Sequence, residues 1–164
     1  MDSFISNSVN RYLRPCDSSD EMALREVYED AVQTCDKSLY SQEQIEAWSA
    51  LAYLPGILDK PLKQGVGWVS CVHQTIEAFA IRYPQDRLAL LYCRGRSSRQ
   101  GHARALLNQI EADTLKDRPI TLKTEASLCS YQLLLRHGWT IISPEEIQIG
   151  GVHFSRYLME KTLY

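Results

Sequence analysis

The segment 88–107 has the residue types and the spacing to bind an anion. An apolar run over 88–93 predicts a β-strand, a polar turn follows over 94–100, and Gly101 opens a helical pattern. The first N–H groups of a helix have no partner within it, and the helix dipole adds about half a positive charge there. Four arginines add side-chain charge: Arg94, Arg96, Arg99 and Arg104. This pattern fits a phosphate or pyrophosphate site, and it fits equally an ordinary strand–helix connection with solvated arginines.

The composition excludes several classes of function. The chain has 164 residues and a net charge of −2, which suits one domain and argues against a general nucleic-acid binder. No apolar stretch approaches the roughly 20 residues that span a bilayer, so no membrane association is expected. The five cysteines are odd in number and form no CxxC, which predicts reduced thiols in a cytoplasmic protein. The histidines have no metal-ligand spacing, and no metal is predicted.

Hydrophobic periodicity predicts a single α+β domain, with helices flanking a mixed, mainly antiparallel sheet. The polar residues 1–10 are expected to form a flexible arm, and residues 11–164 the domain. Strands are expected over 11–16, 67–72, 76–83, 88–93, 119–123, 139–142 and 154–161. Helices are expected over 19–33, from Ser41 to Pro55, and over 59–64, 103–115 and 128–136. Ser41 to Gln44 fits a capping box, and Gly150-Gly151 lies in a long turn between the last two strands.

This order of elements resembles the GNAT superfamily of N-acetyltransferases over residues 12–163. The superfamily's acetyl-CoA motif, Gln/Arg-x-x-Gly-x-Gly/Ala, stands at residues 98–103, where Gly101 and Ala103 match and Ser98 departs. Three further segments are similar to family motifs: Leu13-Arg14-Pro15, Ala78-Phe79 and His137-Gly138-Trp139. A narrower resemblance to the YafP-like branch rests on Tyr40-Ser41-x-Glu43-Gln44-x-x-Ala47-Trp48, on Thr124-Glu125-Ala126-Ser127 and on the ending 151–161.

The resemblance implies acetyl-CoA as co-substrate and assigns residues to hold it. The backbone of the fourth strand would bind the pantetheine arm, and an N–H near Tyr92 would polarise the thioester carbonyl. The strand residues are Leu91, Tyr92 and Cys93. The amides of the motif turn would hold the pyrophosphate, through Arg99, Gln100, Gly101, His102, Ala103 and Arg104. The His102 side chain itself is expected to contact solvent or phosphate.

The catalytic acid and base that the resemblance implies are not both found at the family's usual positions. Ala89 stands where the family often has a carboxylate, and Leu134 stands where it often has an acidic tyrosine. Glu125 is the candidate base, acting directly or through a water, and it also fits a carboxylate that complements a helix dipole. Tyr131 is the candidate acid, and it also fits a packing residue.

Three residues are expected at the acceptor cleft: Tyr40, Trp48 and His153. Trp48 is equally well explained as a core residue of the second helix. The predicted function is transfer of an acetyl group to an amine of a small molecule or peptide, directly from acetyl-CoA in a ternary complex. The alternative is a module that binds CoA or acetyl-CoA with little or no catalysis. The sequence does not decide whether the chain forms a homodimer.

Overall fold

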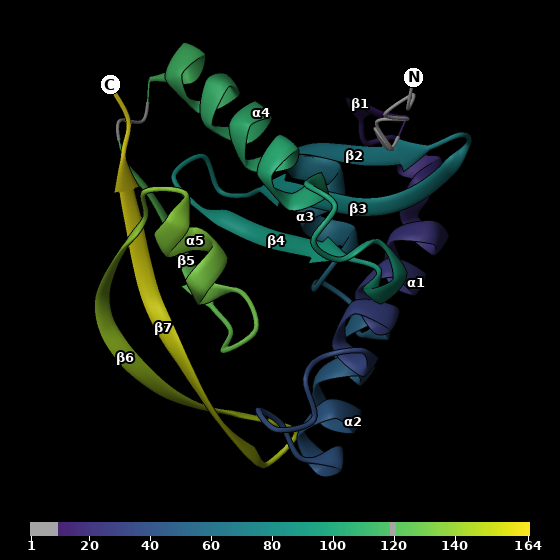
Figure 1. The fold of residues 1–164 in the computed structure, drawn as a ribbon, viewed down its shortest axis with the longest axis vertical. Helices are drawn as coiled ribbons and strands as arrows, with labels where there is room; N and C mark the ends of the chain where they lie inside the picture. The colour runs from purple at the N-terminus through teal and green to yellow at the C-terminus, as the bar shows by residue number, and fades with distance from the viewer. Residues whose placement is uncertain (1–9, 119–120) are drawn as a thin grey trace, which may run out of the picture.

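Two antiparallel sheets form the framework of the molecule (Figure 1). The computed structural model describes residues 10–118 and 121–164, so nearly all of the predicted arm and the expected strand start at 119–120 lie outside the described residues. The first sheet has the order β1 (Arg11–Pro15), β2 (Val66–Val72), β3 (Thr75–Arg82), β4 (Leu88–Cys93). The second has the order β5 (Thr121–Ala126), β7 (Val152–Thr162), β6 (Thr140–Ile149).

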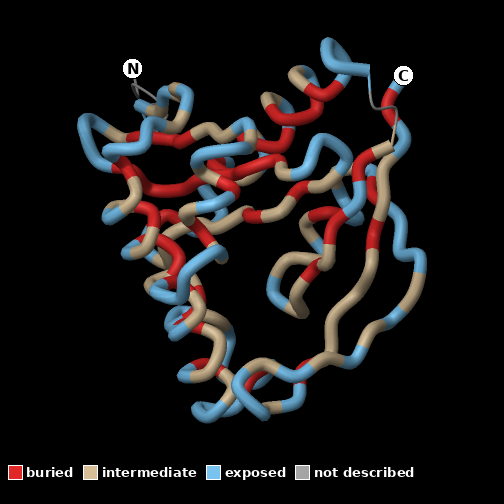
Figure 2. The backbone as a smooth tube through the Cα atoms, turned by 180° about the vertical axis from the view of Figure 1, so that it is seen from behind, coloured by how far each residue is buried: buried red, intermediate tan, exposed pale blue. Residues whose placement is uncertain are grey.

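Helices cover both faces of the first sheet. The helices are α1 (Glu21–Gln33), α2 (Gln42–Ala50), α3 (Asp59–Gln64), α4 (His102–Asp117) and α5 (Tyr131–Arg136), with short 3₁₀ turns at Ser18–Asp20, Leu51–Tyr53 and Gly95–Ser97. Successive side chains of β3 point to opposite faces of the sheet. Phe79 and Ile81 pack with α1 and α2 on one face, while Ala78 and Ala80 pack with α4 on the other. The buried residues accordingly follow the strands and the inward sides of the helices (Figure 2). The predicted α+β class is confirmed.

Local sequence signals fix several of the element ends. The Gln44 amide N–H donates to Ser41 Oγ at 3.2 Å, and Ser41 N–H donates to Gln44 Oε1 at 2.9 Å, so the predicted capping box begins α2. The tight turn between β2 and β3 contains His73 in the left-handed region, with φ of 54°. The helix α5 begins later than predicted, because 127–130 forms a turn in which Tyr131 N–H donates to Ser127 O at 3.0 Å.

The predicted long turn between the last two strands is wrong. The strand β6 continues to Ile149 and β7 starts at Val152, so only Gly150 and Gly151 connect them, with φ of 56° and 78°. Pro144 lies within β6, although proline cannot donate to a β-ladder. β6 is the outer strand of its sheet, the position at which a sheet tolerates proline.

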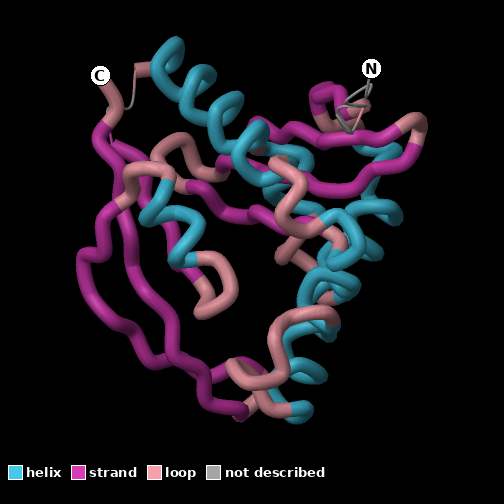
Figure 3. The backbone as a smooth tube through the Cα atoms, in the orientation of Figure 1, coloured by secondary structure: helices cyan, strands magenta, loops and turns pink. Residues whose placement is uncertain are grey.

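The two sheets touch along a short parallel contact between the starts of β4 and β5. Arg87 and Lys123 form a parallel bridge, Lys123 N–H donates to Asp86 O at 2.8 Å, and Thr124 Oγ1 donates to Leu88 O at 2.7 Å. Beyond this contact the described residues of the two strands are not paired, and the sheets diverge (Figure 3). At the far end the β6–β7 hairpin meets α2, where Gln44 Nε2 donates to His153 O at 2.9 Å. The sheets therefore leave an opening between them, and α2 closes the far end of this opening.

Candidate functional site

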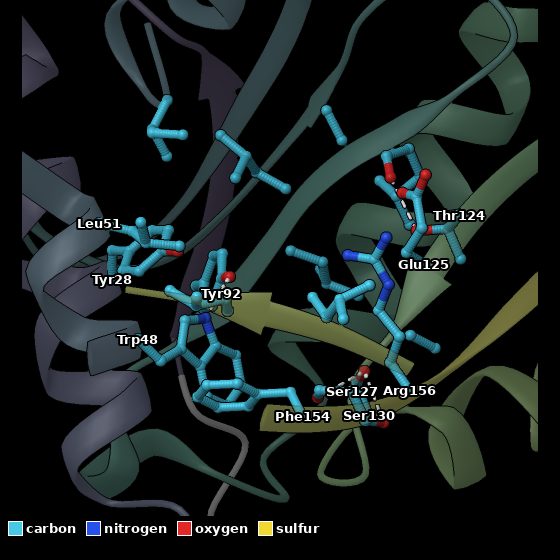
Figure 4. A pocket seen from close by; sticks show the side chains of 18 of the residues that line it. Tyr28, Trp48, Leu51, Tyr92, Thr124, Glu125, Ser127, Ser130, Phe154 and Arg156 are labelled. Carbon is cyan, nitrogen blue, oxygen red and sulfur yellow. Dashed lines mark hydrogen bonds between the residues drawn. The ribbon is translucent and has the colours of Figure 1, made fainter. Parts of the chain in front are cut away.

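A cavity of about 280 Å³ lies in this opening. Figure 4 shows side chains from both sheets and from the first two helices directed into it. Residues of β4 form one wall, residues at the end of β5 form another, and side chains of β6 and β7 complete it. The cavity therefore occupies the place where the divergence of β4 and β5 leaves strand edges without a neighbouring strand.

The wall formed by β4 presents backbone as well as side chains. Leu91 and Tyr92 line the cavity, and Cys93 at the end of the strand does not. The strand pairs with β3 on one side only, so beyond Leu88 its other edge has no strand partner in the described part of the chain. Free N–H and C=O groups on such an edge can bind an extended ligand as an added strand would.

Aromatic side chains form the end of the cavity nearest α2. Tyr40 and Trp48, both predicted at the cleft, line it with ring centroids 5.3 Å apart. Phe154 lies 6.2 Å from the Tyr40 ring and 6.4 Å from the Trp48 ring, and Tyr92 lies 6.4 Å from Trp48. The Tyr40 hydroxyl accepts from Leu128 N–H at 2.8 Å, and burial raises the pKa of Tyr40 to about 12. This end is thus an aromatic surface on which the Tyr40 hydroxyl stays protonated.

Charged and polar side chains gather toward the other end. Glu125 lines the cavity, and its Oε2 accepts from Arg87 Nε at 2.9 Å and lies 2.8 Å from Arg87 Nη2. The helix-dipole explanation for Glu125 does not fit, because α5 begins only at Tyr131 and the carboxylate is directed to Arg87. Ser127 and Ser130 also line the cavity, with their hydroxyls 3.0 Å apart.

The turn before α4 has the geometry of an anion site. Gly101 occupies the N-cap position with φ of 89°, and none of the described side chains caps the helix. Arg99 also lies in the left-handed region, with φ of 61°, and the Arg99 and Arg104 side chains are exposed. Arg11 on β1 adds a charge that the sequence did not indicate, since its Nη1 donates to Gln100 O at 2.7 Å. The free N–H groups of α4 therefore open onto a positively charged surface.

Two of the four arginines expected around this turn are balanced by a buried carboxylate. Arg96 donates from Nε and Nη2 to the two oxygens of Glu77, each at 2.8 Å, and Arg94 Nε lies 3.5 Å from Glu77 Oε2. The Ser97 hydroxyl donates to Glu77 at 2.6 Å. Hydrogen bonds from Arg96 and Ser97 hold the pKa of Glu77 below its ordinary value. Arg94 and Arg96 thus stabilise the turn rather than supply free positive charge.

The expectation that the His102 side chain contacts solvent or phosphate is wrong. His102 is 1 % exposed, and its Nδ1 lies 2.7 Å from Ser70 Oγ on β2. Burial, aided by the nearby charge of Arg11, lowers the pKa of His102. Its ring points into the protein, so only its backbone N–H is available at the helix start.

Two further predicted residues lie outside the cavity lining. Tyr131 packs against Tyr157 with ring centroids 4.8 Å apart, which agrees with its packing alternative. His153 is exposed and pairs with Glu146, because it alternates along β7 with Phe154, whose side chain turns inward. By contrast, Ala89 and Leu134 do line the cavity. The two positions at which the resemblance implies a carboxylate and a tyrosine therefore do face the cavity, but apolar residues occupy them.

The overall structure is similar to solved structures of GNAT enzymes. A GCN5-related N-acetyltransferase from Rhodopseudomonas palustris superposes with a TM-score of 0.88 at 19% identity, over 93% of this chain and 95% of that one. The chain has the GNAT fold. The PaiA N-acetyltransferase from Thermoplasma acidophilum, in complex with coenzyme A, gives 0.73 at 18% identity, over 93% and 99% of the two chains.

A third neighbour has a bound co-substrate. The putative acetyltransferase YncA from Salmonella typhimurium, with acetyl-CoA, gives a TM-score of 0.64 at 16% identity, over 94% of this chain and 95% of that one. No protein-family model and no curated protein matches the sequence. Within residues 10–118 and 121–164, no cluster of three or more His, Cys, Asp or Glu side chains could hold a metal ion. None of the helices described is long and apolar enough to cross a membrane.

Three arginines at the site were missed by the sequence reasoning: Arg11, Arg87 and Arg156. Arg11 and Arg87 reach the site through contacts between residues far apart in the chain, for which no local pattern exists. Arg156 had a signal. It stands two residues after Phe154, and residues two apart in a strand share a face.

Proposed function

We propose that this protein is an acetyl-CoA-dependent N-acetyltransferase that transfers the acetyl group directly to an amine. One observation carries the proposal. The edge of β4 runs along the cavity and leads, through a turn at Gly101, to the uncapped and positively charged start of α4. An extended thioester with a pyrophosphate at its other end requires these two features in this order.

The backbone of Leu91 and Tyr92 would hold the pantetheine arm. The amides of the turn from Gln100 to Arg104 would hold the pyrophosphate, with Arg99, Arg104 and Arg11 as side-chain cations. Support for this assignment comes from the free edge of β4 and from the left-handed conformation of Gly101. Neighbours with the same fold were solved with CoA and with acetyl-CoA.

The reaction needs little covalent chemistry from the protein, because a thioester is already activated. The amine lone pair attacks the carbonyl carbon, a C–N bond forms, the C–S bond breaks, and the thiolate takes up the proton that the amine loses. Holding the two reactants together can lower the barrier by about 7 kcal/mol or more. A β4 N–H near Tyr92 would stabilise the charge that develops on the carbonyl oxygen.

Glu125 is the proposed base, acting directly or through a water. Its carboxylate lies in the cavity lining, held in one orientation by Arg87. The proposal is tested by Glu125→Gln, with Glu160→Gln, on the far part of β7, as the matched control. We expect E125Q to lower kcat at least tenfold with CoA affinity unchanged, and an unchanged rate would remove Glu125 as the base.

A second candidate function is a module that binds CoA or acetyl-CoA without catalysis. The apolar residues Ala89 and Leu134 in the cavity lining favour it, because they stand where the resemblance expects the acid and base. Calorimetry with acetyl-CoA, followed by thiol release with a panel of amines, separates the two. Binding without turnover across the panel supports the module, and absence of binding excludes both functions.

A further inference from the structure

The side chain of Arg156 reaches the cavity from β7. Arg156 stands opposite Glu145 in the β6–β7 register, and Phe154 stands opposite Ile147. Since alternate residues of a strand share a face, Phe154 and Arg156 turn to the same side, and both line the cavity. Figure 4 shows the Arg156 guanidinium directed into the space between the Trp48 and Tyr92 side and Glu125. Its position is thus set by the alternation of β7.

Most of the hydrogen-bonding capacity of Arg156 is unused. Its Nε donates to Glu145 Oε2 at 2.9 Å, and this cross-strand pair fixes the base of the guanidinium. Neither Nη has a hydrogen-bond partner within residues 10–118 and 121–164. The side chain is 32% exposed. A planar fork of N–H donors therefore faces the cavity, in the geometry that binds a carboxylate through two parallel hydrogen bonds.

The two arginines of the lining differ in how fully they are paired. The lining contains two arginines, Arg87 and Arg156, and one carboxylate, Glu125. Arg87 is paired with Glu125, while Glu145, the partner of Arg156, is not part of the lining. Arg87 contacts its carboxylate through two nitrogens and Arg156 through Nε alone, so the cavity offers an anion the two Nη groups of Arg156, which have no partner among the described residues.

We propose that the acceptor is an amino carboxylate with a large apolar side chain, such as a free hydrophobic amino acid. This inference rests on the proposed acetyltransferase function. Arg156 would bind the carboxylate, and the apolar group would lie against Tyr40, Trp48 and Phe154, the rings that form the other end of the cavity.

The test compares acceptors that differ only in the carboxylate. Phenylalanine and leucine are paired with phenylalaninamide and leucinamide, and thiol release from acetyl-CoA is measured for each. We expect wild-type kcat/KM to be at least tenfold higher for the acids. Arg156→Gln should remove this preference, mainly through KM for the acids, and Arg156→Lys should retain part of it. Arg136→Gln, at an exposed arginine on α5, is the matched control and should leave the preference unchanged.

Each outcome has one meaning. Equal use of acids and amides by the wild-type protein, or an unchanged preference in R156Q, overturns the acceptor class while the acetyltransferase function stands. If the protein acetylates other amines but neither the two amino acids nor their amides, the acceptor class is likewise overturned and the acetyltransferase function stands. Failure of the wild-type protein to bind acetyl-CoA in calorimetry overturns the proposed function itself. Calorimetric titration of phenylalanine into the wild-type protein and R156K keeps the test valid if R156Q does not fold.

Discussion

Replacement of Gly101 by alanine tests the anion site at the start of α4. An L-residue in the left-handed region costs about 1–2 kcal/mol of folding free energy. A Cβ at this position would lie 3.2 Å from Arg11 Nη1, so the Arg11 side chain must shift. That shift weakens the hydrogen bond from Arg11 to Gln100 O, at a cost of about 1 kcal/mol. We expect G101A to lower the free energy of unfolding by roughly 2–3 kcal/mol in total.

The matched control is Gly151→Ala. Gly151 has φ of 78°, and a Cβ there would meet nothing within 4 Å, so only the backbone cost of about 1–2 kcal/mol applies. The expected difference of about 1 kcal/mol corresponds to a melting temperature about 2–4 °C lower for G101A than for G151A.

Calorimetric titration with CoA provides the second measurement. The shift of the Arg11 guanidinium and the strain at residue 101 disturb the proposed phosphate site, and we expect G101A to bind CoA more weakly than the wild-type protein. Gly101→Glu should abolish binding, because it places an anion at the helix start. G151A should bind CoA like the wild-type protein. If G101A and G151A were equal in both melting temperature and CoA affinity, the placement of the anion site would be wrong.

Three further predictions concern the framework of the site. Ser41→Ala should lower the free energy of unfolding by about 1 kcal/mol in urea denaturation, because the amide of Gln44 loses its cap, and an unchanged midpoint would contradict this. Glu77→Gln should destabilise the protein by about 2 kcal/mol at pH 7, since Arg96 loses a charged partner. The depressed pKa of Glu77 contributes stability above its ordinary value of 4.5, so the gap to wild type should narrow as the pH falls below that value, and a constant gap would contradict the assignment. Leu106→Ala should cost about 2–5 kcal/mol, because Leu106 is 0% exposed between α4 and the first sheet, and a loss below 1 kcal/mol would contradict this packing.

Much of the framework could be predicted because local patterns determine it. The capping box at Ser41 and the helix start at Gly101 each depend on residues within one or two turns of chain. The aromatic end of the cavity, with Tyr40 and Trp48, was predicted through the resemblance to a known fold rather than from a local pattern.

The charged part of the site could not be predicted in the same way. Arg87 pairs with Glu125 from another sheet, and Arg11 contacts Gln100, which stands 89 residues later in the chain, so both contacts exist only once the chain has folded. His153 was misplaced because side-chain direction depends on the phase of β7, whereas Tyr131 follows its packing alternative. A shift of one residue in a strand turns a side chain to the opposite face.

The edge strand β6 also bears on how copies of the protein behave when they meet. An outer strand of this length, with Ile141 and Ile142 39% and 45% exposed, offers free backbone groups that could pair with a second chain and begin aggregation. Pro144 withholds one ladder donor in the middle of that edge, and Glu145 and Glu146 add charge beside it. Pro144 thus protects β6 from intermolecular pairing, and the cavity-lining face of the hairpin can remain apolar at low risk to solubility.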